Sequence, residues 1–387
     1  MHNNKILSIA NSSQQKAIKH PPAPLMVIAG AGTGKTFTLE NRIVFLIENY
    51  DIRPENILTI TYTEKAAKEL KERVVNQVGL KAHSMFVGTF HSFCFQITKK
   101  FSSDTSPALI DQSEAIHMLL DRYDEFHPLE SEEFSLNPKT AVTDSFIPFF
   151  NRIQDELIDL EKVNLVELRS AYEDNQELYY QIKDLIRIYP IFQKWKKEQN
   201  LIDYNDMIRS AYELLVNDDN LLKEIQSQYR HIIIDEFQDT DPIQAEIAAF
   251  ISESINKEKT AKLETDWTKI KPQNGKLFAV GDPKQSIYKF RKADSSISQI
   301  IQQNLTDNTL YLTENFRSTK PIIKFVNQIF ENLFEESETQ PKYVNLTYPE
   351  KNVSNPLNFG SVQFFGESIE DKTTDQIKKD EAKQISQ

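Results

Sequence analysis

The sequence predicts an α/β fold built on a parallel sheet and interrupted by an all-helical insertion. Short, nearly continuous apolar runs recur along the chain, each followed by a helical pattern, as in parallel strands buried on both faces. Between about residue 95 and residue 200 this alternation stops and helical patterning takes over. The predicted strands are Leu25–Ala29, Ile57–Thr61, Met85–Thr89, His231–Ile234, Leu277–Val280 and Thr309–Leu312.

A cluster of glycines separates the first strand from the first long helical pattern. Leu25–Ala29 is followed by Gly30, Gly32 and Gly34, three of only nine glycines in the chain. A helical pattern over Thr36–Glu48 comes next, with apolar residues at positions 39, 43, 44 and 47. Average glycine usage is about 7%, so this local placement indicates a backbone that approaches another group closely.

The middle and end of the chain predict helices separated by loops. Ser113–Tyr123 and Leu178–Lys197 have helical patterns, and Pro128–Pro148 is expected to be loop. Ser252–Gly275 is polar and charge-rich, which favours a solvated excursion over a binding arm. Beyond residue 331 the chain is acidic and turn-prone until a short helical tail at Asp375–Gln387.

Length and composition limit the class of protein. The 387 residues suffice for two or three domains. No apolar run approaches the roughly 18 residues of a membrane helix, and no apolar leader is evident, so we expect a soluble cytoplasmic protein without a membrane partner. The single cysteine, Cys94, excludes an internal disulfide and a cysteine metal cluster. The net charge of -12 argues against a blanket electrostatic DNA binder but not against a local basic or stacking groove.

The glycine cluster belongs to a phosphate-binding motif. The segment reads AGAGTGKT, which is G-x-x-x-x-G-K-[ST] with alanine at the first position. Its N–H groups would face phosphate oxygens at a helix N-terminus, while Lys35 reaches the β- and γ-phosphates and the Thr36 hydroxyl sits on Mg²⁺. The alternative is a chance loop, but the flanking strand and helix favour nucleotide binding. The predicted contacts are Ala29, Gly30, Ala31, Gly32, Thr33, Gly34, Lys35 and Thr36.

An acidic pair at the end of another strand complements this motif. Residues 232–239 read IIIDEFQD. Asp235 would hold Mg²⁺ through water, and Glu236 is placed to take a proton from the attacking water. The alternative is an acidic strand end at a surface turn. The apolar strand before the pair and the phosphate motif upstream favour the catalytic interpretation.

These motifs and their surroundings resemble the UvrD/Rep/PcrA superfamily 1 DNA helicases over nearly the whole chain. The motif style is similar to that of the RecB and AddA subunits. Seven blocks occur in the order of the family, so chance coincidence is negligible. They are Asn11–Ile18, the phosphate motif, Thr61–Ala67, Gly88–Cys94, Asp235–Asp239, Val280–Arg291 and Leu312–Thr319.

The resemblance implies ATP and Mg²⁺ as cofactors and assigns further roles. It implies that Gln14 reads the adenine edge, that Gln238 and Gln285 sense the γ-phosphate, and that Arg317 supplies a transition-state cation. It also implies that Arg291 pairs with the acidic block, with an ordinary surface arginine as the alternative. The catalytic residues expected from the resemblance are Lys35, Glu236, Gln285 and Arg317.

Some positions depart from the family pattern. Phe37 stands where the family often has an arginine that packs on adenine; it could stack with Phe316 but lacks the cation. Lys292 replaces a common glycine. Asp203 and Asp206 lie in an acidic segment that we interpret as structural rather than as a metal site.

The resemblance also implies a path for single-stranded DNA or a 3′-tailed duplex. Aromatic rings that stack on bases contribute about 1–3 kcal/mol per base without requiring a basic protein. Without the resemblance, aromatics near strands are more often core residues. The expected DNA-binding residues are Tyr62, Thr63, Thr89, Phe90, His91, Tyr288 and Phe290.

The domain organisation implied by the resemblance has three parts. A RecA-like P-loop NTPase lobe covers residues 1–95 and 196–306, a helical insertion covers 96–195, and an incomplete second RecA-like lobe begins at 307–387. A complete α/β lobe needs about 100–200 residues. We therefore expect that a protein partner could supply the rest of the second lobe.

Several functions remain open on this basis. The first is an ATP-dependent DNA helicase or translocase, of the 3′–5′ polarity usual in the family, in DNA repair or recombination. The second is an ATP- and DNA-binding module without autonomous motor activity, which needs a partner or a missing C-terminal half. The third is another P-loop enzyme such as a kinase, against which residues 285–288 (QSIY) argue.

Overall fold

The structure is a computed structural model that describes residues 8–101, 107–156, 158–253, 272, 276–286, 308–334 and 343–349. The chain forms two compact units, residues 1–29 with 35–311 and residues 30–34 with 312–387. Most of the expected excursion at 252–275 and all of the expected tail at 375–387 lie outside the described residues.

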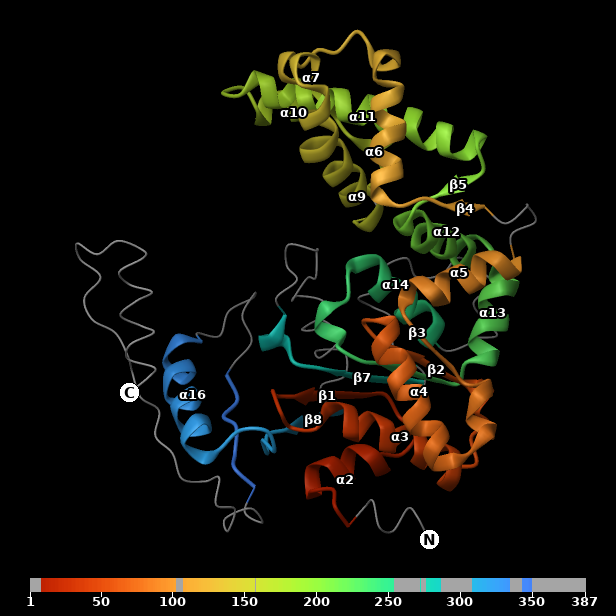
Figure 1. Ribbon diagram of the computed structural model, residues 1–387, viewed down its shortest axis with the longest axis vertical. Helices are drawn as coiled ribbons and strands as arrows, with labels where there is room; N and C mark the ends of the chain where they lie inside the picture. Colours follow the sequence, from red (N-terminus) through yellow and green to blue (C-terminus); the bar gives the residue numbers. More distant parts are fainter. Residues whose placement is uncertain are drawn as a thin grey trace, which may run out of the picture. The chain divides into compact units, whose positions relative to one another are not determined.

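A six-stranded sheet forms the centre of the first unit (Figure 1). The strand order is β3-β2-β6-β7-β1-β8, and the ladders β2–β3, β2–β6, β6–β7 and β1–β7 are parallel. All six predicted strands are confirmed to within two residues. They are β1 (Leu25–Ala29), β2 (Ile57–Ile60), β3 (Phe86–Gly88), β6 (His231–Ile234), β7 (Leu277–Gly281) and β8 (Thr309–Leu312).

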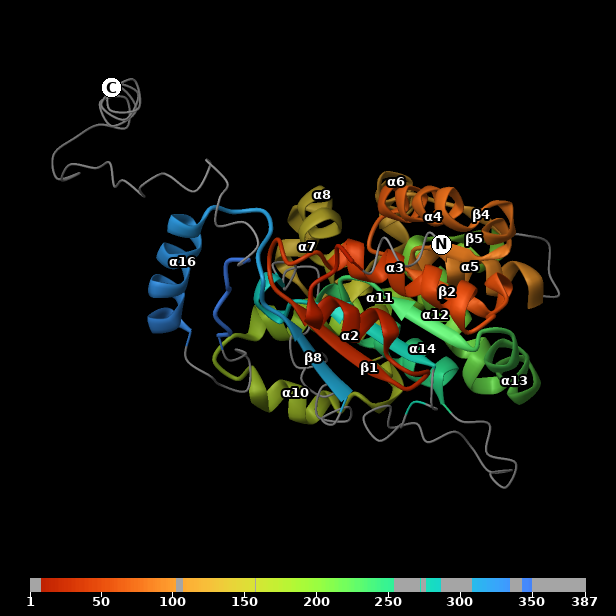
Figure 2. The same ribbon diagram turned by 90° about the horizontal axis from the view of Figure 1, so that it is seen from below.

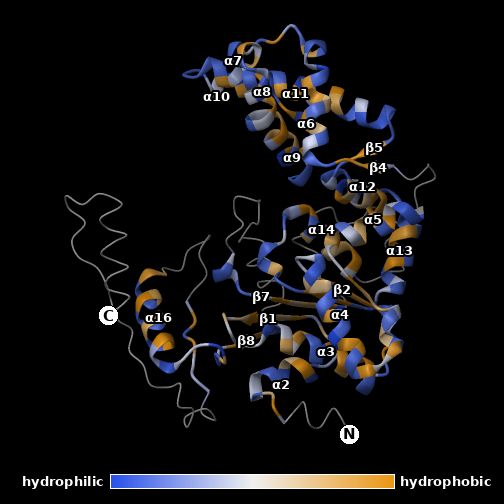
Figure 3. Cartoon of the chain, in the orientation of Figure 1, coloured by the Kyte–Doolittle hydropathy of each residue, from blue (hydrophilic) through white to orange (hydrophobic). Residues whose placement is uncertain are grey.

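Helices cover both faces of this sheet (Figures 1 and 2). One group lies on one face: α2 (Ser12–Lys19), α3 (Lys35–Asn49) and α4 (Glu64–Val78). The other face carries α5 (Phe90–Phe101), α12 (Tyr204–Asn217), α13 (Asp219–Gln228) and α14 (Pro242–Ser252). Every residue of β1, β2, β6 and β7 is buried between these layers. Burial on both faces explains why these strands read as continuous apolar runs, visible for β1 and β2 in Figure 3.

The helical insertion has a core of its own. Its aromatic side chains pack together, with the Phe126 and Trp195 rings stacked 5.1 Å apart. Its helices are α6 (Gln112–Asp121), α7 (Glu132–Leu136), α8 (Pro138–Thr140), α9 (Ile147–Asp155), α10 (Leu165–Ala171) and α11 (Gln176–Glu198), with a π-helical turn, η4, at Ala141–Phe146. Short 3₁₀ turns occur at Pro54–Asn56, Leu80–Ser84, Tyr123–Phe126, Leu160–Lys162, Phe237–Asp239 and Pro283–Gln285.

The prediction of a loop at Pro128–Pro148 is wrong. This segment contains α7, α8, the π-helical turn and the start of α9. Pro138 lies in the first turn of α8, where proline's missing N–H costs no hydrogen bond. Pro148 lies where the π-helical turn passes into α9. Phe134 and Phe146 are almost fully buried in the insertion core, so tertiary packing stabilises helices too short to show a regular period.

A pair of very short strands links the ends of the insertion. β4 (Ala108–Leu109) pairs in parallel with β5 (Leu201–Ile202). Neither strand is among those predicted from the sequence, because two residues carry no periodicity.

A buried lysine lies in the last turn of α11, shortly before β5. Lys196 contacts Asp203 at 2.5 Å and Asp206 at 2.6 Å, and its side chain is 2% exposed. The same two carboxylates form a capping box at the start of α12. This arrangement agrees with the interpretation of Asp203 and Asp206 as structural residues.

The strand at Thr309–Leu312 was expected to open the second lobe at residue 307. Instead it lies next to β1 as an edge strand of the first sheet (Figure 2). The second unit contains α16 (Lys320–Leu333), and the proposed lobe boundaries otherwise stay predictions. Among the described helices, none combines the length and the hydropathy that a membrane crossing requires.

Candidate active site

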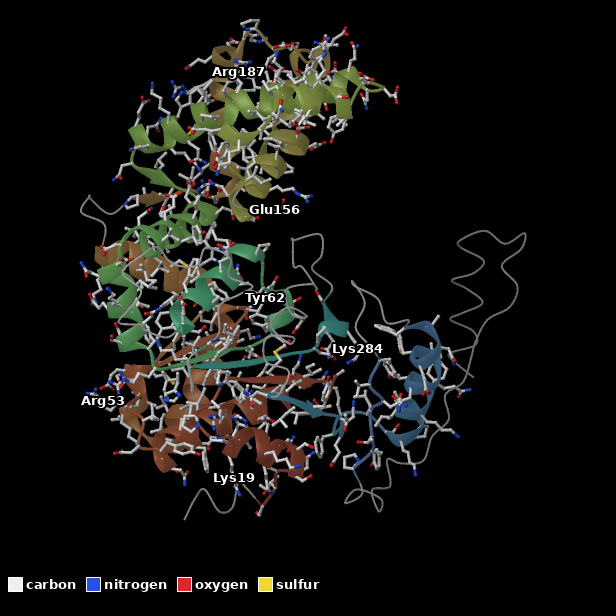
Figure 4. The ribbon with its side chains drawn as sticks, turned by 180° about the vertical axis from the view of Figure 1, so that it is seen from behind. Lys19, Arg53, Tyr62, Glu156, Arg187 and Lys284 are labelled. Atoms are coloured by element: carbon white, nitrogen blue, oxygen red, sulfur yellow. The ribbon has the colours of Figure 1, made fainter. Side chains whose placement is uncertain are left out.

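The predicted catalytic residues of the first unit follow the carboxyl ends of three neighbouring strands. Lys35 begins α3 after the five-residue loop that follows β1, Asp235 and Glu236 directly follow β6, and Gln285 lies in the turn after β7. Figure 4 labels Lys284 in that same turn. Ligands of open parallel sheets bind outside the carboxyl ends of the strands, so the fold gathers these residues at the expected edge.

A closed ring of hydrogen bonds joins five residues at this edge of the sheet. Lys35 Nζ lies 2.7 Å from Glu236 Oε2, which also accepts a 2.8 Å bond from Gln238 Nε2. Gln238 Oε1 accepts from the Asp282 backbone N–H at 2.9 Å. Asp282 Oδ2 accepts from Gln285 Nε2 at 2.8 Å, and Lys35 Nζ reaches Gln285 Oε1 at 3.4 Å. The ring brings together Lys35, Glu236, Gln238 and Gln285, all four of them predicted from the sequence.

Glu236 holds an uncommon backbone conformation. Its φ of 50° and ψ of 46° lie in the left-handed region, which residues other than glycine rarely occupy. It links the buried strand β6 to the 3₁₀ turn Phe237–Asp239. Such backbone strain persists where surrounding contacts fix it and concentrates at functional sites. Here the contacts to Lys35 and Gln238 fix the carboxylate.

Gly281 allows the ring to close. A Cβ at this position would lie 2.5 Å from Gln238 Oε1 and 3.2 Å from the backbone nitrogen of Phe237. Glycine is therefore required here by the close approach of the β6 turn to the end of β7. Gly281 lies in a family block in which the sequence assigned it no role; its position directly after the apolar run Leu277–Val280 was the available signal.

Burial raises the pKa of two carboxyl groups beside the ring. The pKa of Asp235 is raised to about 6, first by burial and then by the Glu236 charge. The same two causes raise the pKa of Asp239 to about 6. A cation placed next to Asp235 would offset this cost of burying a carboxylate.

The oxygen donors at this edge fit Mg²⁺. A carboxylate on Asp235 and the exposed hydroxyl residue Thr36 are hard ligands of the type that Mg²⁺ prefers. Within the described ranges, no group of three or more His, Cys, Asp or Glu side chains forms a metal cage. Sites that bind Mg²⁺ through one or two protein ligands plus phosphates and waters have this character.

The phosphate loop, Gly30–Gly34, packs with the chain after β8 in the second unit. Gly32 and Gly34 have φ values of 71° and 83°, so the loop uses conformations that glycine adopts at little cost. Thr33 Oγ1 donates to the Gly30 carbonyl at 2.8 Å, and the Phe316 N–H donates to the Gly32 carbonyl at 2.8 Å. The loop therefore has the curled backbone that the motif predicts.

Other predicted nucleotide contacts have local structural partners. Gln14 is 3% exposed, and its Oε1 accepts from the Asn11 N–H in a capping box at the start of α2. The carbonyl of Phe37 accepts from the Asn41 side chain within α3. Phe316 is 46% exposed. Contacts of Gln14, Phe37 and Phe316 with adenine stay predictions, and Arg291 lies outside the described residues.

A cavity of about 420 Å³ lies beside the acidic block in the first unit. Five of the predicted DNA-binding residues line it, and Tyr288 and Phe290 lie outside the described residues. The described lining is Ile60, Thr61, Tyr62, Thr63, Thr89, Phe90, His91, Asp155, Asn205, Ile208, Asp235, Glu236, Asp239, Thr240, Asp241 and Gln244.

The aromatic residues of this cavity differ in exposure. Tyr62, labelled in Figure 4, is 38% exposed at the end of β2. Phe90 is 6% exposed and packs in the main core, which leaves little of its ring for stacking. The His91 ring lies 5.8 Å from the Tyr204 ring, and burial lowers the pKa of His91, which favours its neutral form. Among the aromatic residues predicted for DNA binding that the structure describes, Tyr62 best fits a stacking role.

The two threonines predicted to contact DNA have partners within the protein. Thr63 Oγ1 caps α4 by accepting from the Ala66 N–H at 3.1 Å. Thr89 Oγ1 donates to Glu64 Oε1 at 2.7 Å. Both stay candidates, although each already serves local structure.

The cavity also contains residues that sequence reasoning missed. Asp155 comes from the insertion helix α9 and Asn205 from α12. Neither lies in a family block, so the sequence carried no signal for them. Five acidic residues, Asp155, Asp235, Glu236, Asp239 and Asp241, make the lining acidic. Such a lining favours a base or an amine over a phosphate group that carries no metal ion.

Known proteins with similar sequences support the helicase resemblance that these motifs indicate. A model of the UvrD/REP helicase N-terminal domain matches residues 10–306. The putative ATP-dependent DNA helicase YjcD of Bacillus subtilis (strain 168) is 32% identical over 81% of this chain and 37% of its own length. The ATP-dependent DNA helicase PcrA of the same organism is 31% identical over 88% of this chain and 41% of its own length.

A third relative comes from another organism. PcrA of Staphylococcus aureus (strain Mu50 / ATCC 700699) is 28% identical over 88% of this chain and 42% of its own length. The chain thus spans about two fifths of the length of the curated relatives it matches. Because the domain model matches most of its residues, the chain belongs to the UvrD/REP helicase family.

Proposed function

We propose that this chain binds ATP with Mg²⁺ and hydrolyses it as the ATP-binding part of a single-stranded DNA translocase or helicase. The observation that carries the proposal is the ring of Lys35, Glu236, Gln238, Asp282 and Gln285 at the carboxyl ends of β1, β6 and β7. Family membership supports nucleotide use.

Lys35 and Glu236 would divide the work of phosphate binding and water activation. The Lys35 side chain is 13% exposed and its ammonium contacts Glu236, so a triphosphate that takes this ammonium releases the Glu236 carboxylate. The released carboxylate accepts a proton from the attacking water. A bound Mg²⁺, held by Thr36 and Asp235, would neutralise charge on the phosphates.

Gln238 and Gln285 would connect the nucleotide to the rest of the site. Each amide donates to one ring partner and accepts from another, so each can exchange partners without creating an unpaired charge. Their expected role is to sense the γ-phosphate. The role of Arg317 as a transition-state cation, inferred from the resemblance, is part of the same proposal.

Single-stranded DNA is the proposed polymer substrate, with Tyr62 stacking on a base at the acidic cavity. The names of YjcD and PcrA support a helicase assignment. We further propose a 3′–5′ polarity, a 3′-tailed duplex as a substrate, a role in repair or recombination, and a cytoplasmic location.

A second candidate is an ATP- and DNA-binding module that needs more protein to act as a motor. Helix α16 supports it, because several large apolar side chains on this helix are exposed while Ile323 is buried. These are Ile322 at 45%, Phe330 at 38% and Leu333 at 63%. A further lobe, from this chain or from a partner, would cover such a face.

Titration of ATP into the purified chain in millimolar MgCl₂, followed by turnover assays with and without a single-stranded oligonucleotide, tests the proposal. Lys35→Ala should abolish binding or turnover, because the phosphates lose their cation. DNA-stimulated turnover supports the motor, and binding with negligible turnover supports the module. The absence of any binding heat in the parent chain would refute both.

A further inference from the structure

Asn315 links the phosphate loop to the segment that carries Arg317. It is 3% exposed, and both ends of its side chain are bonded. Nδ2 donates to the Ala31 carbonyl at 2.7 Å. Oδ1 accepts from the N–H groups of Arg317 at 2.9 Å and Ser318 at 2.7 Å. The Asn315 N–H donates to the Thr347 carbonyl at 2.8 Å, which fixes its backbone as well.

The loop and this segment contact one another at adjacent points. The Phe316 N–H donates to the Gly32 carbonyl at 2.8 Å, and the Gly30 N–H donates to the Leu312 carbonyl at 3.3 Å. A Cβ on Gly32 would lie 2.7 Å from Arg317 Cβ and 2.9 Å from Asn315 Nδ2. The loop backbone therefore lies directly against Asn315 and the root of the Arg317 side chain, all within the second unit.

We propose that Asn315 is a positioning residue that holds the phosphate loop and Arg317 in one register, and thereby sets the preference for ATP over ADP. The proposal rests on the nucleotide site proposed above. A carboxamide suits this place because it donates to the loop carbonyl with one atom and accepts from two N–H groups with the other. An arginine held at a fixed offset from the loop meets the γ-phosphate, which ADP lacks.

Asn315→Asp separates the two halves of this contact. Aspartate keeps the acceptor for Arg317 and Ser318, but it places an oxygen against the Ala31 carbonyl in place of a donor. The affinity for ATP should fall by about tenfold relative to that for ADP, the size expected when a displaced Arg317 loses one hydrogen bond to the charged γ-phosphate. The double variant with Arg317→Ala should lose no more of the ATP preference than Arg317→Ala alone.

Asn327→Asp is the matched control. Asn327 has the same bonding pattern in the same unit: Nδ2 donates to the Leu346 carbonyl at 2.8 Å, and Oδ1 accepts from the Leu346 N–H at 3.0 Å and from the Tyr343 hydroxyl at 2.9 Å. It bonds to no phosphate-loop atom through these groups. Asn327→Asp should lower stability and leave the ratio of ATP to ADP affinity at the parent value.

Hydrogen exchange of the unliganded chain supplies a readout that does not need nucleotide. Asn315→Asp should accelerate exchange of the Gly30 and Phe316 amides by about tenfold, since both bonds depend on the register of the loop. Asn327→Asp should leave these two amides unchanged. Unchanged exchange in Asn315→Asp, or an equal change in both variants, overturns the proposal.

The two readouts also separate this inference from the proposed function. Faster exchange in Asn315→Asp together with a parent chain that binds no nucleotide would refute the nucleotide site and, with it, the ATP preference. Faster exchange with an unaltered ratio of ATP to ADP affinity would refute the inference and leave the nucleotide site intact.

Discussion

Lys35 and Lys196 are two partly or fully buried lysines with carboxylate partners, yet their surroundings differ. Lys196 is 2% exposed and contacts Asp203 and Asp206, which also cap a helix. Lys35 is 13% exposed, and its partner Glu236 is 33% exposed on a left-handed backbone.

The difference indicates what each cluster does. The Lys196 cluster satisfies several local bonds at once, at the point where α11 meets α12. The Lys35 ring combines the strained backbone of Glu236 with two amides that can exchange hydrogen-bond partners. A cluster that serves stability alone requires neither feature. We therefore expect changes to the Lys196 cluster to alter the free energy of unfolding, and changes to the Lys35 ring to alter ATP turnover.

The largest expected effect comes from Glu236→Gln. Glutamine keeps the size of the side chain but cannot accept the proton of the attacking water, so turnover should fall by about 100- to 10,000-fold. Binding of ATP in calorimetry should persist. Glu69→Gln, at an exposed carboxylate of α4, is the control and should hydrolyse ATP like the parent. Parent-like turnover in Glu236→Gln would show that another group is the base.

Lys196→Ala tests the other cluster. Removal of this ammonium leaves two carboxylates without their cation at a mostly buried site, which should cost about 3–5 kcal/mol in the free energy of unfolding. Denaturant titration measures it. Lys194→Ala, whose side chain is 74% exposed, should change stability little. Equal costs in the two variants would contradict the assigned role of Lys196.

Gly281→Ala tests the ring where the end of β7 approaches Gln238. The added methyl group would press on Gln238 Oε1, so turnover should fall and overpacking should cost about 1–3 kcal/mol of stability. Gly79→Ala is the contrast, because that site has open space but a φ of 81°. It should lower stability through the backbone without a change in turnover. A Gly281→Ala variant with parent turnover would remove the ring from catalysis.

The smallest effect is expected at Tyr62, on the cavity that shares Glu236 with the ring. Tyr62→Ala should weaken binding of a labelled single-stranded oligonucleotide by about 1–3 kcal/mol, near the lower end because the ring is only 38% exposed. Affinity for ATP without DNA should stay constant. Fluorescence anisotropy measures the first and calorimetry the second. Undiminished DNA affinity would exclude Tyr62 from the path.

The sheet and the ring residues could be predicted from the sequence because their signals are local. Strands buried on both faces are continuous apolar runs. Asp235 and Glu236 directly follow one such run, and Lys35 belongs to the glycine motif that follows another. The placement of β8 beside β1 could not be predicted in this way, since edge pairing depends on contacts distant in sequence.

The parts that sequence reasoning missed depend on packing. The helices of residues 132–155 are short and stabilised by an aromatic core, so periodicity did not reveal them. The close approach at Gly281 and the two-ended contact of Asn315 exist only once loops from distant segments meet. No local pattern encodes such tertiary hydrogen bonds.

The acidic lining of the cavity has a consequence for its ionic-strength dependence. The described residues that line it include no lysine or arginine, whereas Asp155, Asp235, Glu236, Asp239 and Asp241 are among them. A DNA segment bound in this cavity would release few of its condensed counterions, because no cationic side chain among the described residues lines the cavity. Its affinity for the cavity should therefore change little with added salt. Selectivity at this place then arises from ring faces and donor groups rather than from net charge.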